Sequence, residues 1–366
     1  MQKEQINDKE AIFVFATFLI GSTALVGIGG DAKNDAWLAG IIGVIMAIPL
    51  LLIYSRLLNL YPGKDLFDIL DVLLGKILGK VIAIIYTLFS LHLGALVIHN
   101  FSQFINTVAM PETPIIISMF ALGLVCIYAA RLGIEVLSRT VGLFFPFILF
   151  IIIVVQLLNI PQLHFENFKP FLANGMKPVL KGAFNAFSFP FTESVVLLGV
   201  FSSLKTKKSS YKVIFLGLLI AASIILILTT RNILTLGNLA GSLYFPSHVA
   251  VSMISIGDFI QRIEVTVAIV LVFNVFVKSS ICLIVACKGI AKIFNLVEYR
   301  SVVIQTGLLM IFLSYILYDN IMVMTYWAFK VYPYYAFPME VIFPVIIWIV
   351  AEYKVRKSEK IKAIKV

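Results

Sequence analysis

The sequence predicts an all-α integral membrane protein with ten transmembrane helices, the first and sixth of which are interrupted. Three observations predict this fold class: an apolar composition, ten apolar segments of membrane-spanning length, and a break in the middle of two of them. The chain has 366 residues, of which 61% are hydrophobic and 13% are charged. Charged residues make up about 25% of ordinary soluble domains. No water-soluble core of this size could hide so much apolar surface.

Each transmembrane helix needs about 20 mostly apolar residues. The segments that meet this requirement are 11–29, 36–58, 80–109, 114–130, 141–160, 179–201, 212–233, 263–288, 302–318 and 333–352. The third is long enough to be strongly tilted or to project beyond the bilayer. Residues 1–10 mix both charge signs and nine apolar segments follow the first, so the start is not read as a signal peptide. We expect a single transmembrane domain over residues 1–366.

The basic residues predict the orientation of the chain. The net charge is +10, but Lys and Arg gather in the short connections and the C-terminal tail, so nucleic acid is not expected as a partner. The side that holds both termini collects 21 of the 29 basic residues, the opposite side holds seven, and Lys278 lies inside a segment. Cytoplasmic loops carry the excess of Lys and Arg. Both termini are therefore expected in the cytoplasm.

The interrupted segments lead two halves of five helices each. Five is an odd number, so the second half must start on the opposite side of the membrane, and a shared fold would be an inverted repeat. This arrangement resembles the LeuT-like fold of the amino acid–polyamine–organocation superfamily. The resemblance implies that the two broken helices hold a substrate near the bilayer midplane.

The first break is Gly21-Ser22-Thr23. An unwound helix here could aim free backbone amides at a carboxylate, using the positive end of a half-helix. A patch of small residues for close helix packing is the alternative. The matching break in the sixth segment favours a ligand site at Gly21, Ser22 and Thr23.

The second break is Phe189-Pro190-Phe191-Thr192-Glu193. Pro190 removes a backbone donor and frees a carbonyl one turn earlier. A carboxylate such as Glu193 is costly inside a membrane and is by default functional, as a proton carrier, as the partner of a ligand amine, or as half of an ion pair. A protonated carboxyl that serves packing is the alternative. We predict that these five residues line the ligand site.

Lys278 in the eighth segment needs a carboxylate or carbonyl partner, or must lose its proton. Sodium-coupled relatives of this fold hold sodium between the first and eighth helices, and Lys278 could place a fixed positive charge there instead. Glu193 could equally be its partner, and snorkelling towards an interface is a further alternative. We place Lys278 and Asn274 among second-rank candidates for coupling.

The third segment adds His92, His99 and Gln103 on one helical face. They could relay protons or bind a ligand, although such residues often hold helices together, and they remain second-rank candidates. Cys126, Cys282 and Cys287 are read as packing residues. No metal spacing, nucleophile elbow, P-loop or dinucleotide motif is present, so we expect no cofactor, no metal and no enzyme activity.

Several motifs together resemble the B-subunit permease family of spore germinant receptors. Polar stretches at residues 167–175 and 177–182 resemble the family's connection into the sixth helix, and Leu137-Ser138-Arg139 with Phe144-Phe145-Pro146-Phe147 resembles the start of its fifth. Asp258 to Glu264 resembles its Arg-x-Glu motif before the eighth helix, here Arg262 and Glu264. The chain departs from the family at Thr23, where a Gly-rich triplet is common, and at Lys278.

The resemblance implies a permease-like subunit in the spore's inner membrane. It would bind a small germinant, expected to be an amino acid, and signal through a partner A subunit and a C-subunit lipoprotein. A proton-coupled amino acid transporter is the main alternative, because the same pocket serves both functions. A ligand-opened ion conduit ranks below both, since no ring of charged residues suggests a filter.

Overall fold

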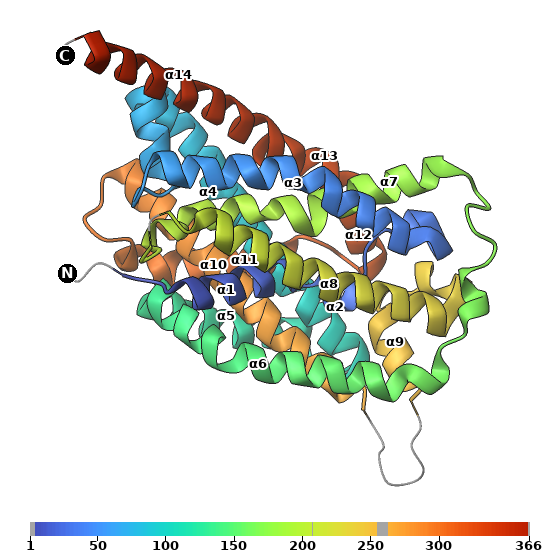
Figure 1. Ribbon diagram of the computed structural model, residues 1–366. Coiled ribbons are helices and arrows are strands. Elements are labelled where there is room, and N and C mark those ends of the chain that lie inside the picture. Colours follow the sequence, from blue (N-terminus) through green and yellow to red (C-terminus); the bar gives the residue numbers. More distant parts are fainter. Residues whose placement is uncertain (1–3, 207, 255–262, 365–366) are drawn as a thin grey trace.

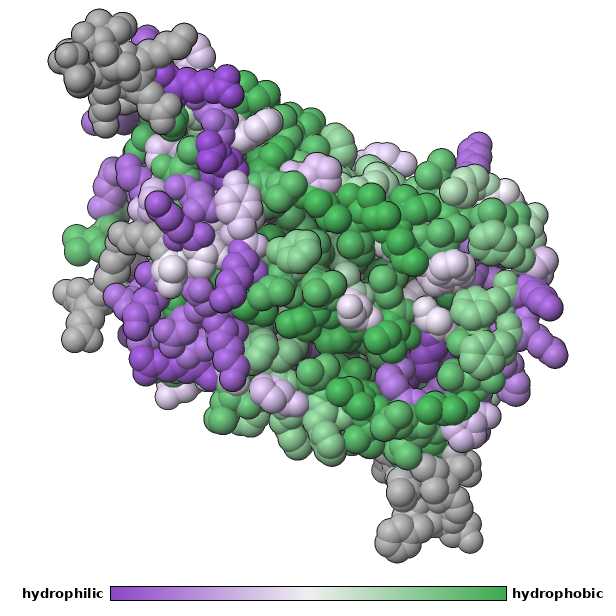
Figure 2. Space-filling model, in the orientation of Figure 1, coloured by the Kyte–Doolittle hydropathy of each residue, from purple (hydrophilic) through white to green (hydrophobic). Residues whose placement is uncertain are grey.

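The computed structural model describes residues 4–206, 208–254 and 263–364, which fold as a bundle of helices lying side by side (Figure 1). Within these residues, extended pairing is confined to one isolated bridge between Ile6 and Leu204. Both chain ends lie at the same end of the bundle in Figure 1. A broad apolar belt separates two polar ends on the face seen in Figure 2, as a membrane-spanning protein requires.

Several of the helices are much longer than those of an ordinary globular domain. In chain order the elements are α1 Asp8–Ile20, α2 Thr23–Val26, η1 Gly30–Asp35, α3 Ala36–Leu60, α4 Leu66–Val108, α5 Ile115–Leu132, α6 Ile134–Asn159, α7 Met176–Ala186, η4 Phe187–Phe191, η5 Thr192–Gly199, α8 Ser210–Leu236, η7 Gly237–Gly241, α9 Pro246–Ser252, α10 Val265–Phe294, α11 Val303–Ile316, α12 Ile321–Tyr326, η9 Trp327–Val331, α13 Tyr332–Phe337, η10 Pro338–Ile342 and α14 Phe343–Ile364. Short 3₁₀ turns make up the remaining pieces.

Eight helical stretches of the described chain are long and apolar enough to cross a membrane. They are Gly30–Leu60, Leu66–Val108, Ile115–Leu132, Ile134–Gln162, Ser210–Gly241, Val265–Phe294, Tyr299–Ile316 and Ile321–Lys357. Each overlaps one of the predicted segments, and the protein is a multi-pass membrane protein. The first and sixth predicted segments are the two without such a stretch, because α1 has 13 residues and α7 has 11.

Two segments begin more than ten residues before their predicted starts. The third segment was expected to begin at residue 80, but α4 begins at Leu66 and continues through a non-helical Gly75. The tenth was expected to begin at residue 333, whereas helical structure begins at Ile321 and includes the π-helical turns η9 and η10. Pro333 and Pro338 in this segment leave carbonyls without an amide partner, which suits wider turns.

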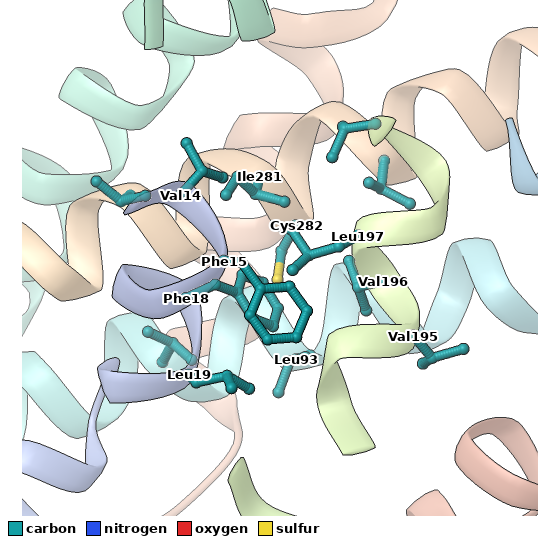
Figure 3. Close-up of a cluster of buried hydrophobic side chains, with 14 of the residues drawn as sticks. Val14, Phe15, Phe18, Leu19, Leu93, Val195, Val196, Leu197, Ile281 and Cys282 are labelled. Atoms are coloured by element: carbon teal, nitrogen blue, oxygen red, sulfur yellow. The ribbon is translucent and has the colours of Figure 1, made fainter. Parts of the chain in front are cut away.

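The core packs α1 against the second half of the sixth segment. Figure 3 shows Phe15 and Phe18 of α1 facing Val196 of η5, with Leu93 of α4 beside them. All four side chains are buried. Phe15 and Phe18 precede Gly21, and Val196 follows Pro190, so this apolar contact joins the segment before the first break to the segment after the second.

Candidate functional site

The first break separates α1 from α2. Gly21 adopts a φ of 29°, which ends α1, and α2 resumes at Thr23. The Thr23 hydroxyl donates to the carbonyl of Ile20 at 2.5 Å, so it satisfies a backbone group that the break leaves open. The Ser22 hydroxyl is buried and has no hydrogen-bond partner in the described structure. Of the two hydroxyls at this break, only that of Ser22 is therefore available to bind a ligand.

The second break lies at η4, between α7 and η5. Phe189 is non-helical, with φ −115° and ψ 110°, and Pro190 follows it through a cis peptide bond. Pro190 has no N–H to continue the helix, which accounts for the interruption at this point of the sequence. The two interrupted elements run in opposite directions through the bundle in Figure 1, and α1 packs against η4 and η5.

An ion pair joins the second break to α10. The Lys278 ammonium donates to Glu193 Oε2, and both side chains are almost completely buried, with exposed fractions of 0% and 1%. The rings of Phe18 and Phe189 lie 5.1 and 5.3 Å from the ammonium and add a cation–π contribution. Because each charge compensates the other, the pair can exist in a region from which water is excluded.

The same lysine also lies against the first break. A Cβ placed on Gly21 would come within 2.8 Å of Lys278 Cδ and 3.3 Å of its Nζ. Gly21 therefore makes room for the Lys278 side chain between α1 and α10. Lys278 thus contacts both interrupted elements, and the Glu193 pairing that the sequence left open is the one that the structure contains.

A second buried carboxylate, Glu340, lies on η10. The hydroxyls of Ser188 and Thr192 each donate to its Oε2 at 2.8 Å, and Tyr332 donates to its Oε1 at 3.3 Å. Tyr332 also interacts electrostatically with Glu193. Through Ser188 and Thr192, Glu340 joins the last segment to the second break.

A small cavity adjoins these groups. It has a volume of about 40 Å³ and is lined by Ser22 from the first break, by Phe189 and Glu193 from the second, and by Asn100 of α4. Aromatic side chains complete its wall: Tyr244, Tyr318, Trp327, Phe329 and Tyr332. A space of this size holds a few water molecules. A larger molecule would enter only if side chains or half-helices moved.

A wider vestibule of about 390 Å³ lies next to the cavity, at the end of the bundle away from the chain ends. Val26, Tyr244, Thr325 and Phe329 line both spaces and so separate them. The approach to the cavity is therefore from the end opposite the chain termini.

Ion pairs link the elements at the rim of this vestibule. Asp31 of η1 accepts from Lys330 of η9 at 2.7 Å and lies 3.2 Å from Lys181 of α7. Asn185 of α7 donates to Asp31 at 2.7 Å. These contacts join the segment after the first broken helix to the start of the sixth and to the last.

The predicted site residues divide into three groups. Ser22, Phe189 and Glu193 line the cavity. Three more act on the cavity indirectly. Gly21 leaves space for Lys278, Pro190 interrupts the helix, and Thr192 donates to Glu340. Thr23 donates its hydroxyl to the backbone, and Phe191 is buried in the apolar core.

The second-rank residues lie outside the cavity lining. His99 Nδ1 donates to the Ser314 carbonyl of α11 at 2.8 Å. His99 therefore holds two helices together, as the alternative interpretation of the sequence predicted. His92 packs edge-on against Trp327 and Tyr335, both at 5.3 Å. Gln103 Nε2 donates to Thr107 of its own helix at 3.3 Å. Asn274 is fully buried one turn before Lys278, and its amide has no partner in the described structure.

The sequence prediction did not include Glu340 or the aromatic wall. Glu340 lies within the predicted tenth segment, so the cost of an intramembrane carboxylate, applied to Glu193, would have identified it as well. The aromatic residues gave no such signal, because Tyr and Trp are also common at membrane interfaces. Of the Asp258–Glu264 motif, residues 258–262 lie outside the described residues; Glu264 precedes α10 as its N-cap.

Comparison with known sequences gives consistent matches along the chain. A family model described as spore germination protein matches residues 5–321. Spore germination protein KB of Bacillus subtilis (strain 168) is 29% identical and covers 99% of this chain and 98% of its own. The putative spore germination protein YfkT of the same organism is 26% identical over 76% of each chain. Spore germination protein XB of Bacillus anthracis is 25% identical over 74% of this chain and 77% of its own.

Comparison with solved structures gives the fold. MHP1, a nucleobase-cation-symport-1 family transporter in a closed conformation with bromovinylhydantoin bound, has a TM-score of 0.65 and 11% identity, covering 89% of this chain and 75% of that one. MhsT in complex with L-phenylalanine has a TM-score of 0.62 and 11% identity, covering 96% and 89%. The fold is that of the LeuT-like transporters.

Proposed function

Because the chain belongs to the spore germination protein family, we propose that it is the membrane subunit of a spore germinant receptor. It binds a small germinant, an amino acid, in the cavity between the two interrupted segments and thereby triggers germination. The single observation that carries this proposal is the convergence of Ser22, Phe189 and Glu193 on one cavity. These residues come from both breaks, which mark the substrate site in transporters of this build.

The cavity chemistry suits a zwitterion with an apolar side chain. Lys278 binds one oxygen of Glu193, and the other can accept from a ligand ammonium. The Ser22 hydroxyl is the donor at the first break for a ligand carboxylate, since the Gly21 N–H already donates to the Thr17 carbonyl. Trp327, Tyr332 and their aromatic neighbours surround the remaining space, so we propose a hydrophobic amino acid as the ligand class.

Signalling follows from the small size of the cavity. At about 40 Å³ the space is too small for an amino acid, so a bound ligand favours a conformation in which the half-helices have moved apart. A ligand that binds one conformation better shifts the population towards it. We propose that a partner A subunit and a C-subunit lipoprotein in the spore inner membrane read that conformation.

The proposed topology has ten spans, with both termini in the cytoplasm. The interrupted first and sixth segments supply the two crossings beyond the eight continuous ones. Their opposite directions support a five-plus-five inverted repeat (Figure 1). In this orientation the vestibule opens on the side opposite the cytoplasm. A germinant arrives from that side.

The test is thermal unfolding of the purified protein with a panel of amino acids, nucleosides and sugars. A ligand at 100 times its dissociation constant stabilises the folded state by about 2.7 kcal/mol. One or a few hydrophobic amino acids should stabilise the wild type, and Glu193→Gln or Ser22→Ala should abolish the response. Gln103→Ala is the matched control, because Gln103 lies outside the cavity lining and should leave the response intact. If both cavity variants respond as the wild type does, the ligand is held elsewhere.

A proton-coupled amino acid transporter is the second candidate. It is favoured by the LeuT-like fold and by the buried carboxylates Glu193 and Glu340, either of which can carry a proton. Vesicles containing the protein separate the functions. Accumulation of a labelled amino acid under a proton gradient indicates a carrier, binding without flux indicates a receptor, and a ligand-opened ion leak indicates a conduit.

A further inference from the structure

A buried guanidinium lies apart from the cavity described above. Arg231 of α8 is 4% exposed, and within the described residues it has no carboxylate within ion-pair distance. Its Nε donates to Asn232 Oδ1 at 2.9 Å, whereas its Nη1 is buried without a partner. A buried positive charge is costly unless a counter-charge compensates it. Among the described residues, no group around Arg231 supplies such a charge.

Arg231 lines a second small cavity among α2, α6, α8, α9 and α10, which has a volume of about 30 Å³. Gln156 of α6 lines it too, and its Nε2 is another buried donor without a partner. Ser247 of α9 also lines it, and its oxygen already accepts from Asn232 Nδ2 at 3.0 Å, which leaves its proton to donate. Arg231, Gln156 and Ser247 therefore each have a donor to offer to this space, whereas the Thr266 hydroxyl in its wall donates to the Ile263 carbonyl.

We propose that this cavity binds a small monovalent anion, chloride in the cell. The guanidinium provides the countercharge, and the Gln156 amide and Ser247 hydroxyl provide neutral hydrogen bonds. The volume admits about two water-sized molecules by the usual minimum per water, which suits one halide ion and excludes an amino acid. Water alone would compensate no charge.

The cavity also touches a half-helix of the germinant site. Ala24 of α2 lines the anion cavity, and Ser22 and Val26, at either end of the same short stretch, line the central one. A bound anion would thus lie behind the element that contacts the germinant. This consequence rests on the proposed function, whereas anion binding itself does not.

The experiment compares thermal unfolding of the purified full-length protein in potassium chloride and in potassium gluconate at constant ionic strength. Chloride should raise the unfolding temperature saturably, bromide should replace it, and gluconate should have no effect. Arg231→Gln should remove the difference between the salts. Arg139→Gln is the matched control, because Arg139 is exposed and pairs with Glu135 on its own helix, and it should respond to chloride as the wild type does.

A second measurement covers the case in which Arg231→Gln fails to fold. Crystals of the wild type grown in bromide should give an anomalous signal beside Arg231, Gln156 and Ser247. Equal unfolding temperatures of the wild type in chloride and gluconate, or a bromide-containing crystal without signal at this cavity, would overturn the proposal. Neither result depends on germinant binding, so loss of the anion site and loss of the germinant site are distinguishable.

Discussion

Lys278 and Glu193 carry opposite charges in a region where a single charge would be costly. The two form a buried pair beneath the rings of Phe18 and Phe189. Lys278→Met should destabilise the protein by about 3–5 kcal/mol, because it leaves the Glu193 carboxylate buried without a partner. Chemical denaturation in detergent measures this loss.

The double variant Lys278→Met with Glu193→Gln provides the control. It removes both charges and should be much closer to the wild type in stability than the sum of the single variants. If the two single losses add in the double variant, the residues are energetically independent and the pair does not stabilise this region.

Glu340 accepts three side-chain hydroxyl donors, two on the same oxygen. Glu340→Gln would present an amide N–H₂ to one set of these donors, so at least one hydrogen bond is lost. We expect a loss of about 1–3 kcal/mol in stability. In the wild type, the Glu352 carboxylate pairs with the partly exposed Arg56 at 2.6 Å. Comparing the unfolding temperatures of Glu340→Gln and Glu352→Gln therefore separates the effect of burial from the effect of removing a charge. An equal, small effect of both substitutions would contradict this account.

How far the site could be predicted depended on the rarity of each residue type. A carboxylate or lysine within an apolar segment is rare enough to be noticed, and Glu193 and Lys278 were identified in that way. Their pairing could not be fixed, because spacing along a chain says nothing about contact across 85 residues. The predicted role of Thr23 at the ligand remains a prediction; in the structure its hydroxyl donates to the Ile20 carbonyl, a bond that depends on the local backbone.

At the scale of elements, Gly21 sets the geometry of the first break. Its φ of 29° is unfavourable for residues with a side chain, and an added Cβ would lie 3.0 Å from the Phe18 carbonyl oxygen and 2.8 Å from Lys278. Gly21→Ala should therefore cost about 1–3 kcal/mol and weaken ligand binding. Gly30→Ala is the control, because nothing lies within 4 Å of an added Cβ there. Equal unfolding temperatures of the two variants would show that the break tolerates a side chain.

Predicting the elements succeeded where a long apolar run determines the structure. The eight continuous spans each overlap a predicted segment, and the two interruptions fall at Gly21 and Phe189-Pro190, where small residues and proline break the pattern. The start of the last segment was missed. Residues 321–332 are mostly apolar, but Lys330 interrupts the run just before residue 333, and the prediction began the segment after that charge.

At the scale of the whole molecule, Asp31 connects three elements around the vestibule. Asp31→Asn should free Lys330 and Lys181 and let these elements separate more often, at a cost of at most about 1 kcal/mol, since the pairs are partly exposed. Labelling of Thr325→Cys, between the vestibule and the cavity, should become severalfold faster with an impermeant thiol reagent. Native Cys126, Cys282 and Cys287 are buried.

Asp71→Asn is the control for this measurement. Asp71 lies 3.1 Å from Lys292, which also pairs with Asp68, outside the vestibule lining. It should leave the labelling rate of Thr325→Cys unchanged. Unchanged labelling in Asp31→Asn as well would mean that the aromatic residues, rather than the ion pairs, limit access.

The buried ion pair has an electrical consequence. One elementary charge moved across a 100 mV membrane potential changes the free energy by about 2.3 kcal/mol. Lys278 and Glu193 together carry no net charge, and neither does a zwitterionic amino acid. A rearrangement that moves them as a unit performs almost no electrical work. We expect binding of an amino acid to proteoliposomes to be equal before and after valinomycin sets a potassium diffusion potential, so that binding does not depend on whether the membrane is energised.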